Sequence, residues 1–469
     1  MSTDSRGAAR RARGRGRYTR GVAIAIGALV VIGGAAAGTG LTQGPRATSI
    51  QQDPQAAAVQ SGSRVIFTAN EALTDIDPSQ VTVEPATDFT LDAAGRTVGV
   101  RFPTALDADT DYTVTIDGVQ GIGGGPTSTL TTSFTTPKAS VLMLERDATG
   151  DDRIVSHTVG GSDGDAVFTA AQIDDFRATS AYLIATTVDG DGTMHVTVVN
   201  RGNGSTHEIA LPGSGIVTGL QVSERGQLYG FTFTDANLSA AGGRENVLFT
   251  GSLASSDDPA PVVVGGSEPS IDRWRFVPET SSLLLNSFNG DLTLVDRQDP
   301  DGEVSSFGTA LGIEGVARST YTALIDRLEE GFVELDLASG EQRVLTDAHL
   351  DGDALLGHIL PLPNGDTLRS YAMLEDGIPT TSRIVTMNQD GDVHDIAETE
   401  DGDVLQQVCA SPSAQYIALT VSDSSGAAYD GGVQSLPEIM ETRIYDAATG
   451  DEVETWDGFD ISWCEVGPW

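Results

Sequence analysis

Short apolar runs separated by turn residues dominate the last two thirds of this chain. The stretch 270–296 contains three such runs, around Trp274, Leu284 and Leu294, and Gly290 lies in the second of its two turns. Strands of about five residues broken by Gly, Asn, Asp and Pro are typical of all-β proteins. The pattern therefore predicts three β-strands joined by tight turns in this stretch.

Variants of the same stretch recur along the chain. The apolar position in the first strand of each unit recurs after 44, 54, 42, 43, 49 and 53 residues. These aligned positions are Phe176, Leu220, Trp274, Val316, Ile359, Val408 and Ile461. A period of roughly 40–50 residues with about four strands per unit is typical of β-propeller blades. The sequence predicts a seven-bladed β-propeller over 138–469, with the seventh blade closed by 459–463 and 140–170. A pair of β-sandwiches or a β-helix is the alternative.

Two segments carry a resemblance to a known family. The segments 276–296 and 409–423 (CASPSAQYIALTVSD) resemble the strand-turn-strand unit of WD40-like and TolB-like propeller repeats. The resemblance extends over 138–464, although the regular Gly-His and Trp-Asp dipeptides of true WD40 repeats are missing. It implies a propeller, and propellers commonly bind ligands at the mouth of their central channel.

A smaller region, 63–137, alternates apolar and polar residues with a period of two. Six or so short strands in such a length predict a β-sandwich. Leu106, Thr110, Tyr112 and Val114 form an L-x-x-x-T-x-Y-x-V motif, by which the region resembles the bacterial Ig-like domain of the SbsA type. The resemblance implies a spacer or stalk in a surface protein and indicates no binding site.

The start of the chain has the pattern of a membrane anchor. Seven arginines lie in the first 20 residues, and 21–44 contain no charged residue. About 20 apolar residues span a bilayer core, and preceding basic residues place the N-terminus in the cytoplasm. We expect a cytoplasmic tail (1–20), a transmembrane signal-anchor helix (21–43), an extracytoplasmic linker (44–62) and the remaining domains outside the cell membrane. A cleaved signal peptide is the alternative, for which Ala35, Ala36 and Ala37 offer small residues.

The chain is strongly acidic, with 67 acidic and 27 basic side chains and a net charge of −40. The first 44 residues hold seven of the basic groups and one acidic group, so the remainder carries 66 acidic and 20 basic groups, or −46. Such a charge repels nucleic acid, anionic lipid and anionic wall polymer. We therefore expect no nucleic-acid partner.

The two cysteines, Cys409 and Cys464, fall on predicted first strands of neighbouring units. In an oxidising compartment a structural disulfide between them would pin the closing strand. Two buried free thiols are the alternative.

No residue emerges as catalytic, cofactor-binding or metal-binding. Ser162 lies in a G-x-S-x-G pattern, but the flanking residues predict a hairpin loop and not the strand-to-helix turn of a hydrolase. The six histidines lack zinc-site spacing. Acidic turns such as 189–192 and 390–392 offer some of the oxygens that calcium needs, but none has the full EF-hand pattern. We expect no cofactor, with calcium as the alternative.

The sequence predicts a membrane-anchored, non-catalytic binding or scaffolding protein of the cell surface, with an acidic propeller on an Ig-like stalk. Its partner is an extracellular protein, peptide or glycan. The first alternative is an extracellular enzyme, such as a glycan-active hydrolase or lyase, using the channel mouth. Convergent carboxylates, arginines and aromatics there would favour it, and an apolar plug would exclude it. The second alternative is a purely structural envelope protein. The preference for binding rests on fold analogy.

Overall fold

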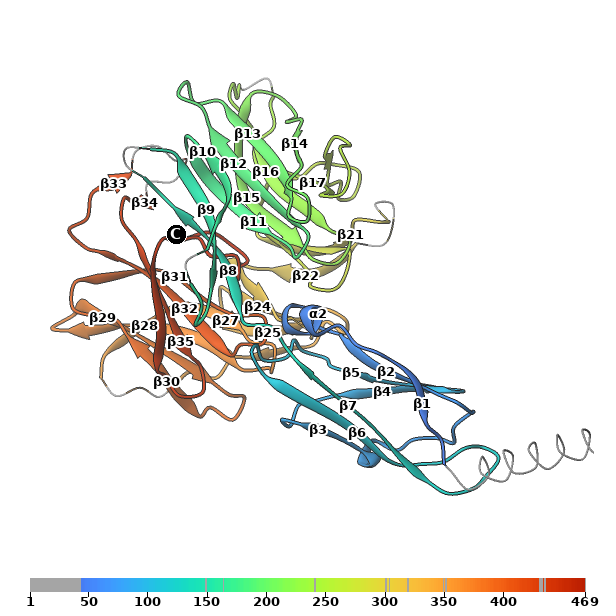
Figure 1. The fold of residues 1–469 in the computed structure, drawn as a ribbon. Helices are drawn as coiled ribbons and strands as arrows, with labels where there is room; N and C mark the ends of the chain where they lie inside the picture. Colours follow the sequence, from blue (N-terminus) through green and yellow to red (C-terminus); the bar gives the residue numbers. More distant parts are fainter. Residues whose placement is uncertain are drawn as a thin grey trace, which may run out of the picture. The chain divides into compact units, whose positions relative to one another are not determined.

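The computed structural model describes residues 44–468, apart from 148–149, 163, 240–241, 300–301, 303, 319, 349, 351, 430–432 and 434–435. In these residues the chain is almost entirely strand, turn and loop (Figure 1). Its helical segments there are α2 (Pro54–Val59) and the 3-10 turn η1 (Pro78–Gln80). Within the described ranges no helix is long and apolar enough to cross a membrane. The predicted tail (1–20) and anchor (21–43) lie outside these ranges.

The chain forms two compact units. The first, in the described residues, comprises 44–53, 64–101 and 111–134. Its strands make two antiparallel sheets, β1-β2-β5-β4 and β3-β6-β7. The strands are β1 (Ala47–Gln51), β2 (Arg64–Ala69), β3 (Val81–Glu84), β4 (Thr90–Ala94), β5 (Thr97–Arg101), β6 (Asp111–Val119) and β7 (Ser128–Thr135). Alternate residues are buried, such as Val65 and Phe67 in β2 and Tyr112 and Val114 in β6, so the sheets present apolar faces.

The predicted linker 44–62 differs from the structure. Residues Ala47–Gln51 form β1, which pairs antiparallel with β2, and Pro54–Val59 form α2. All five residues of β1 are exposed. The strand is therefore held by backbone hydrogen bonds to β2 and not by an apolar face, which is why hydrophobic patterning gave no sign of it.

The second unit comprises 54–63, 102–110 and 135–468 and contains seven successive antiparallel sheets (Figure 1). The first sheet holds β8 (Ser140–Glu145), β9 (Asp152–Thr158) and β10 (Ala166–Ala170). The second holds β11 (Ile173–Ala178), β12 (Tyr182–Val188), β13 (Met194–Asn200) and β14 (Thr206–Ile209). The third holds β15 (Gly215–Ser223), β16 (Leu228–Asp235), β17 (Val247–Ser252) and β18 (Ala260–Pro261).

The fourth sheet holds β19 (Ile271–Phe276), β20 (Ser282–Ser287), β21 (Asp291–Asp296) and β22 (Ser305–Thr309). The fifth holds β23 (Gly312–Val316), β24 (Thr322–Arg327), β25 (Gly331–Asp336) and β26 (Gln342–Val344). The sixth holds β27 (Ala354–Pro361), β28 (Thr367–Glu375), β29 (Ile378–Met387) and β30 (Val393–Glu398). The seventh holds β31 (Asp403–Ala410), β32 (Tyr416–Asp423), β35 (Glu441–Asp446) and β36 (Glu452–Asp457), and the hairpin β33 (Ala428–Tyr429) and β34 (Leu436–Pro437) lies between β32 and β35.

We call the first strand of each of the last six sheets its leading strand. Consecutive leading strands from β11 to β27 contact one another, and β31 contacts β28 and β29 of the sixth sheet. The first sheet takes its leading segment from the far end of the chain: Leu144 N–H donates to Phe459 O (2.8 Å) and Phe459 N–H to Leu144 O (3.0 Å). Sheets of about four strands that meet along their leading strands make a propeller-type fold.

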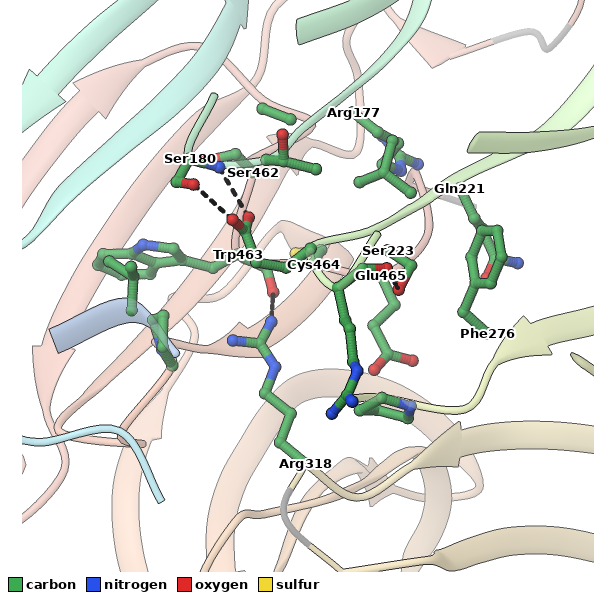
Figure 2. Close-up of a pocket in the computed structure, with 18 of the residues that line it drawn as sticks. Arg177, Ser180, Gln221, Ser223, Phe276, Arg318, Ser462, Trp463, Cys464 and Glu465 are labelled. Atoms are coloured by element: carbon green, nitrogen blue, oxygen red, sulfur yellow. Dashed lines mark hydrogen bonds between the residues drawn. The ribbon is translucent and has the colours of Figure 1, made fainter. Parts of the chain in front are cut away.

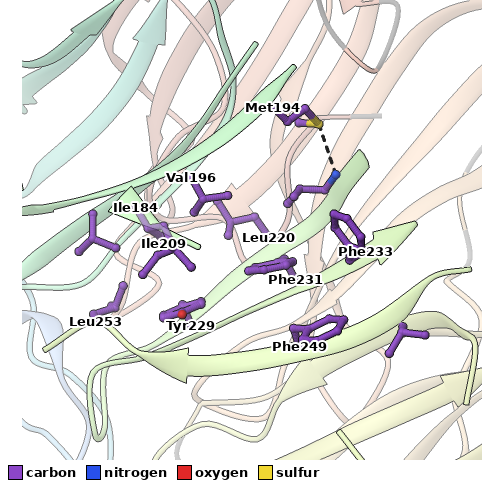
Figure 3. Close-up of a cluster of buried hydrophobic side chains, with 13 residues drawn as sticks. Ile184, Met194, Val196, Ile209, Leu220, Tyr229, Phe231, Phe233, Phe249 and Leu253 are labelled. Atoms are coloured by element: carbon purple, nitrogen blue, oxygen red, sulfur yellow. Dashed lines mark hydrogen bonds between the residues drawn. The ribbon is translucent and has the colours of Figure 1, made fainter. Parts of the chain in front are cut away.

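The aligned apolar positions of the repeat lie in the cores between sheets. All seven, from Phe176 to Ile461, are at most 5% exposed. Figure 3 shows one such core, where Leu220 and Phe231 of the third sheet pack against Ile184 and Val196 of the second. Each sheet therefore covers the apolar face of its neighbour.

The core of the fourth and fifth sheets gives a test of this packing. Leu284 of β20 is fully buried there. Replacing it (Leu284→Ala) is expected to lower the free energy of unfolding by about 2–5 kcal/mol, since a cavity adds to the lost apolar burial. The matched control, Leu328→Ala, changes a side chain that is 81% exposed and is expected to cost at most about 0.5 kcal/mol. Equal losses in urea denaturation of the two variants would contradict this assignment of the core.

Candidate functional site

The residues that flank each aligned apolar position lie on the opposite face of the leading strand, because side chains alternate. In β11, β15 and β19 these flanking residues line one cavity of about 400 Å³. They are Asp175, Arg177, Gly219, Gln221, Arg273 and Arg275. We call this cavity the β11–β19 mouth. It lies towards the start of the three strands, because Asp174, Thr218 and Asp272 also line it.

A second cavity of about 220 Å³ lies at the other end of the same strands. It shares Arg177 and Gln221 with the mouth and is lined further along the chain by Ser180, Ser223 and Phe276 (Figure 2). The two cavities thus lie at opposite ends of β11, β15 and β19, and we call the space that joins them the channel.

The segment 462–468 passes along this channel, and we call it the channel segment. Its first part, including Trp463 and Glu465, lines the second cavity (Figure 2). Its last part, Val466 to Pro468, lines the mouth. Gln407 Nε2 donates to Val466 O (2.7 Å). Arg318 Nη2 donates to Trp463 O (3.4 Å). Polar side chains of the channel wall therefore hold the backbone of the segment.

A disulfide joins Cys464 of the channel segment to Cys409 of β31, with the two Cα atoms 5.4 Å apart. The two cysteines are 55 residues apart in the sequence. The bond fixes the channel segment covalently to the seventh sheet.

The channel wall contains a buried ionic cluster. Arg177 Nη1 lies 2.7 Å from Asp175 Oδ1 and 2.8 Å from Asp460 Oδ1, and the Arg177 side chain is 3% exposed. Burial acts to lower the pKa of Arg177, but the two carboxylates outweigh it and raise that pKa. Burial raises the pKa of Asp175 well above its usual value, against the opposing effect of Arg177. Asp460 adopts φ 50°, a left-handed conformation that non-glycine residues adopt only where the surroundings stabilise it.

Arg275 links the wall to the channel segment. Its side chain is buried, with Nη1 donating to Trp274 O (2.8 Å) and Nη2 to Ile313 O (3.2 Å). Its Nε lies 3.7 Å from Glu465 Oε2. Burial lowers the pKa of Arg275 and raises that of Glu465, which Arg275 and Arg318 act to lower.

The β11–β19 mouth differs from the rest of the protein in charge. Four arginines and four aspartates line it among the described residues: Arg146, Arg177, Arg273, Arg275, Asp174, Asp175, Asp272 and Asp460. The chain after residue 44 has 66 acidic against 20 basic groups, so the mouth is balanced where the molecule is acidic. Asn246, Gln221 and two threonines add amide and hydroxyl groups. Phe288, 59% exposed, provides an aromatic ring at the same cavity.

Ser162 and the acidic turns weighed from the sequence do not line these two cavities. Of the histidines, His358 lines a third cavity of about 80 Å³, together with Arg275 and Glu465. Ser162 is in the connection between β9 and β10, with no helix after it. The acidic stretch 189–192 joins β12 to β13, and 390–392 lies between β29 and β30. The residues that the structure describes contain no group of three or more His, Cys, Asp or Glu side chains that could hold a metal ion. Calcium binding therefore stays an untested alternative.

Sequence reasoning did not identify the channel residues. Part of the signal was present, since several of them stand directly beside an aligned apolar position, as Asp175 and Arg177 do around Phe176. Charged residues on both sides of a buried position in a predicted innermost strand indicate a channel wall.

No protein-family model matches the sequence, and no curated protein matches it. Among solved structures, the chain is similar to a prolyl endopeptidase at 11% identity, covering 69% of this chain and 50% of that one, with a TM-score of 0.47. It is similar to an oligogalacturonate lyase in complex with manganese at 8% identity, covering 87% and 98%, with a TM-score of 0.46. It is also similar to a putative TolB from Agrobacterium tumefaciens at 13% identity, covering 68% and 90%, with a TM-score of 0.33. The chain thus spans half the length of the prolyl endopeptidase. The likenesses are weak, and the propeller-type fold follows from the sheet order itself.

The ionic cluster predicts a pH-dependent loss of stability. The variant Arg177→Met removes the cation and leaves Asp175 and Asp460 in place. Burial of these two groups without a cation is expected to lower the free energy of unfolding by about 3–5 kcal/mol near neutral pH. A carboxyl group whose pKa is higher in the folded than in the unfolded state binds protons more readily when folded, so acid favours the folded state. The loss should therefore shrink between about pH 7 and about pH 4.5 in chemical denaturation.

The control for this variant is Arg383→Met, which removes an ion-pair partner of Asp395. The side chain of Asp395 is 62% exposed. A surface pair of this kind is worth at most about 1 kcal/mol. A penalty for Arg177→Met that is as small as that of the control, or that stays the same at both pH values, would contradict the role of the cluster.

The disulfide gives a second prediction. A closed loop of about 55 residues is expected to contribute about 4 kcal/mol through the entropy of the unfolded chain. The double variant Cys409→Ser, Cys464→Ser should therefore unfold at a lower temperature than the wild type. Dithiothreitol should lower the unfolding temperature of the wild type to a similar value. Calorimetry with and without reductant measures both effects, and a double variant as stable as the oxidised wild type would rule out a stabilising bond.

Proposed function

We propose that the protein is a membrane-anchored, non-catalytic binding protein of the cell surface. In this proposal 21–43 is the signal anchor, 1–20 lies in the cytoplasm and 63–137 is an SbsA-type Ig-like stalk. The seven sheets of the second unit form a closed seven-bladed propeller. The pairing of Phe459 with Leu144 supports closure, and a disulfide suits an extracytoplasmic location.

The ligand of the propeller binds at the β11–β19 mouth. The observation that carries this is the balanced set of arginines and aspartates there, in a protein with a net charge of −40. Because these groups neutralise one another, as in the ion pairs of Arg177, the mouth favours a polar ligand of low net charge. A cavity of about 400 Å³ falls within the range of small-molecule sites, roughly 300–1,000 Å³.

A neutral glycan fits this chemistry best. Each sugar hydroxyl both donates and accepts hydrogen bonds, so it pairs with arginine and amide donors and with carboxylate acceptors at once. The apolar face of a sugar ring can cover the exposed ring of Phe288. The arginines would orient the ligand, and the aromatic ring would supply apolar contact.

A glycan-active hydrolase or lyase is the second candidate, at the same mouth. It is favoured by the proximity of Asp175 and Asp460 and by the raised pKa of Asp175, which burial produces. A raised pKa makes a carboxyl group a better proton donor towards neutral pH, as a general acid requires. Both carboxylates nevertheless contact Arg177, which is the arrangement of a structural ion cluster.

The test uses the full-length protein in detergent and a panel of neutral envelope oligosaccharides, with saturation-transfer NMR as the readout. Wild-type protein is expected to bind members of the panel. Phe288→Ala is expected to weaken binding about tenfold, since it removes the aromatic contact.

Tyr321→Ala is the matched control, because Tyr321 is a similarly exposed aromatic residue (51%) in the turn between β23 and β24, at the other end of the leading strands. Equal loss in the two variants would contradict binding at the mouth. Shortening of the oligosaccharides in the same samples would favour the enzyme. Absence of binding across the panel would overturn the glycan proposal and leave the purely structural alternative.

A further inference from the structure

Exposed apolar side chains gather at one edge of the seven sheets. Among the described residues of 138–468, fourteen large apolar side chains are exposed. Ten of them lie at the start of a leading strand or in the connection between the second and third strands of a sheet. The ten are Ile216, Leu238, Phe288, Leu311, Leu328, Leu355, Ile378, Val404, Val433 and Ile439.

The two positions lie at the same edge because the strands are antiparallel. The start of β23 pairs with the end of β24, as Gly312 with Asp326, and Leu328 follows directly. In the same way Ala354 pairs with Met373, and the turn that leads to Ile378 follows. We call this edge, which includes the rim of the β11–β19 mouth, the apolar edge.

The connections between second and third strands form a series along the apolar edge. Five consecutive sheets, the third to the seventh, each place an exposed apolar residue there: Leu238, Phe288, Leu328, Ile378 and Ile439. Their exposed fractions range from 46% to 81%. The repeated position concentrates exposed apolar side chains at this edge, which holds ten of the fourteen, and a concentration of apolar surface is characteristic of protein interaction sites.

Acidic residues flank these apolar positions. Exposed Glu329 and Glu330 follow Leu328, and exposed Glu375 and Asp376 precede Ile378. Arg327, which precedes Leu328 in the sequence, is 8% exposed and is directed inward, with Nη2 donating to Phe307 O (2.9 Å). The apolar edge thus combines apolar side chains with negative charge.

We propose that the apolar edge is a docking surface for a basic amphipathic segment of a partner protein. The apolar side chains of the partner's segment would cover the exposed apolar residues from Leu238 to Ile439, which we call the apolar tips. Its Lys or Arg side chains would pair with the flanking carboxylates. A second copy of this chain is disfavoured, since it would bring acidic side chains against acidic side chains in a molecule of net charge −40. Anionic lipid is disfavoured for the same reason. This surface goes beyond the proposed glycan site, and it does not require that the mouth be occupied.

The probe is a labelled amphipathic helical peptide of Leu and Lys, roughly 14 residues long, and fluorescence anisotropy measures its binding to the full-length protein in detergent. A matched peptide carries Glu in place of each Lys. The wild type is expected to bind the Lys peptide and not the Glu peptide, with affinity falling between about 0.15 M and about 0.5 M salt.

The triple variant Leu328→Ser, Ile378→Ser, Ile439→Ser removes three apolar tips and leaves Phe288 in place. It is expected to bind the Lys peptide at least tenfold more weakly. The control Val167→Ser, Tyr321→Ser, Val344→Ser changes three exposed apolar residues away from the apolar edge and should bind as the wild type does. All six residues are exposed, so both variants should fold, which circular dichroism checks.

A second variant separates charge from apolar contact. Glu329→Gln, Glu330→Gln, Glu375→Gln, Asp376→Asn keeps every apolar tip and should also weaken binding of the Lys peptide. Equal binding of the Lys peptide to all variants, or equal binding of the Glu peptide, would overturn the proposal. So would light scattering that shows a wild-type dimer and a monomeric triple variant, because the occupant would then be a second copy. Oligosaccharide binding by the triple variant tests the mouth separately, so either proposal can fail without the other.

Discussion

The pairing of 459–462 with β8 is the contact on which the second unit depends. The first sheet has three strands, and without the segment 459–462 its strand β8 would expose an edge of unpaired backbone groups. The hydrogen bonds between Leu144 and Phe459 cover that edge, and Ser462 N–H adds another to Leu142 O (2.9 Å). The same residues bring Phe459 into the core around Phe176. The pairing with β8 and the core packing therefore involve the same residues in this region.

The same pairing also determines the chemistry of the channel. Asp460 is immediately beside the paired residue Phe459, and its carboxylate neutralises Arg177, 283 residues away. A buried guanidinium group is costly without such a partner. The channel segment follows directly and is held by Gln407, by Arg318 and by the bond between Cys464 and Cys409.

The second unit offers two chemically different surfaces at the same edge. Inside the mouth, arginines and aspartates neutralise one another in an otherwise acidic molecule. Around it, apolar tips such as Leu328 and Ile378 stand beside carboxylates. The first arrangement suits a polar ligand of low charge, and the second suits a basic amphipathic partner.

The sequence alone determined the features that depend on local alternation and period. The seven aligned apolar positions are buried, because strand geometry places every second side chain on the same face whatever the rest of the chain does. It also placed two cysteines on neighbouring units, though their pairing depended on an argument about compartment. The exposed strand β1 gave no apolar signal and escaped prediction. Only the tertiary structure decided which charges meet, that 462–468 occupies the channel and that ten exposed apolar residues share one edge, because these contacts join residues far apart in sequence.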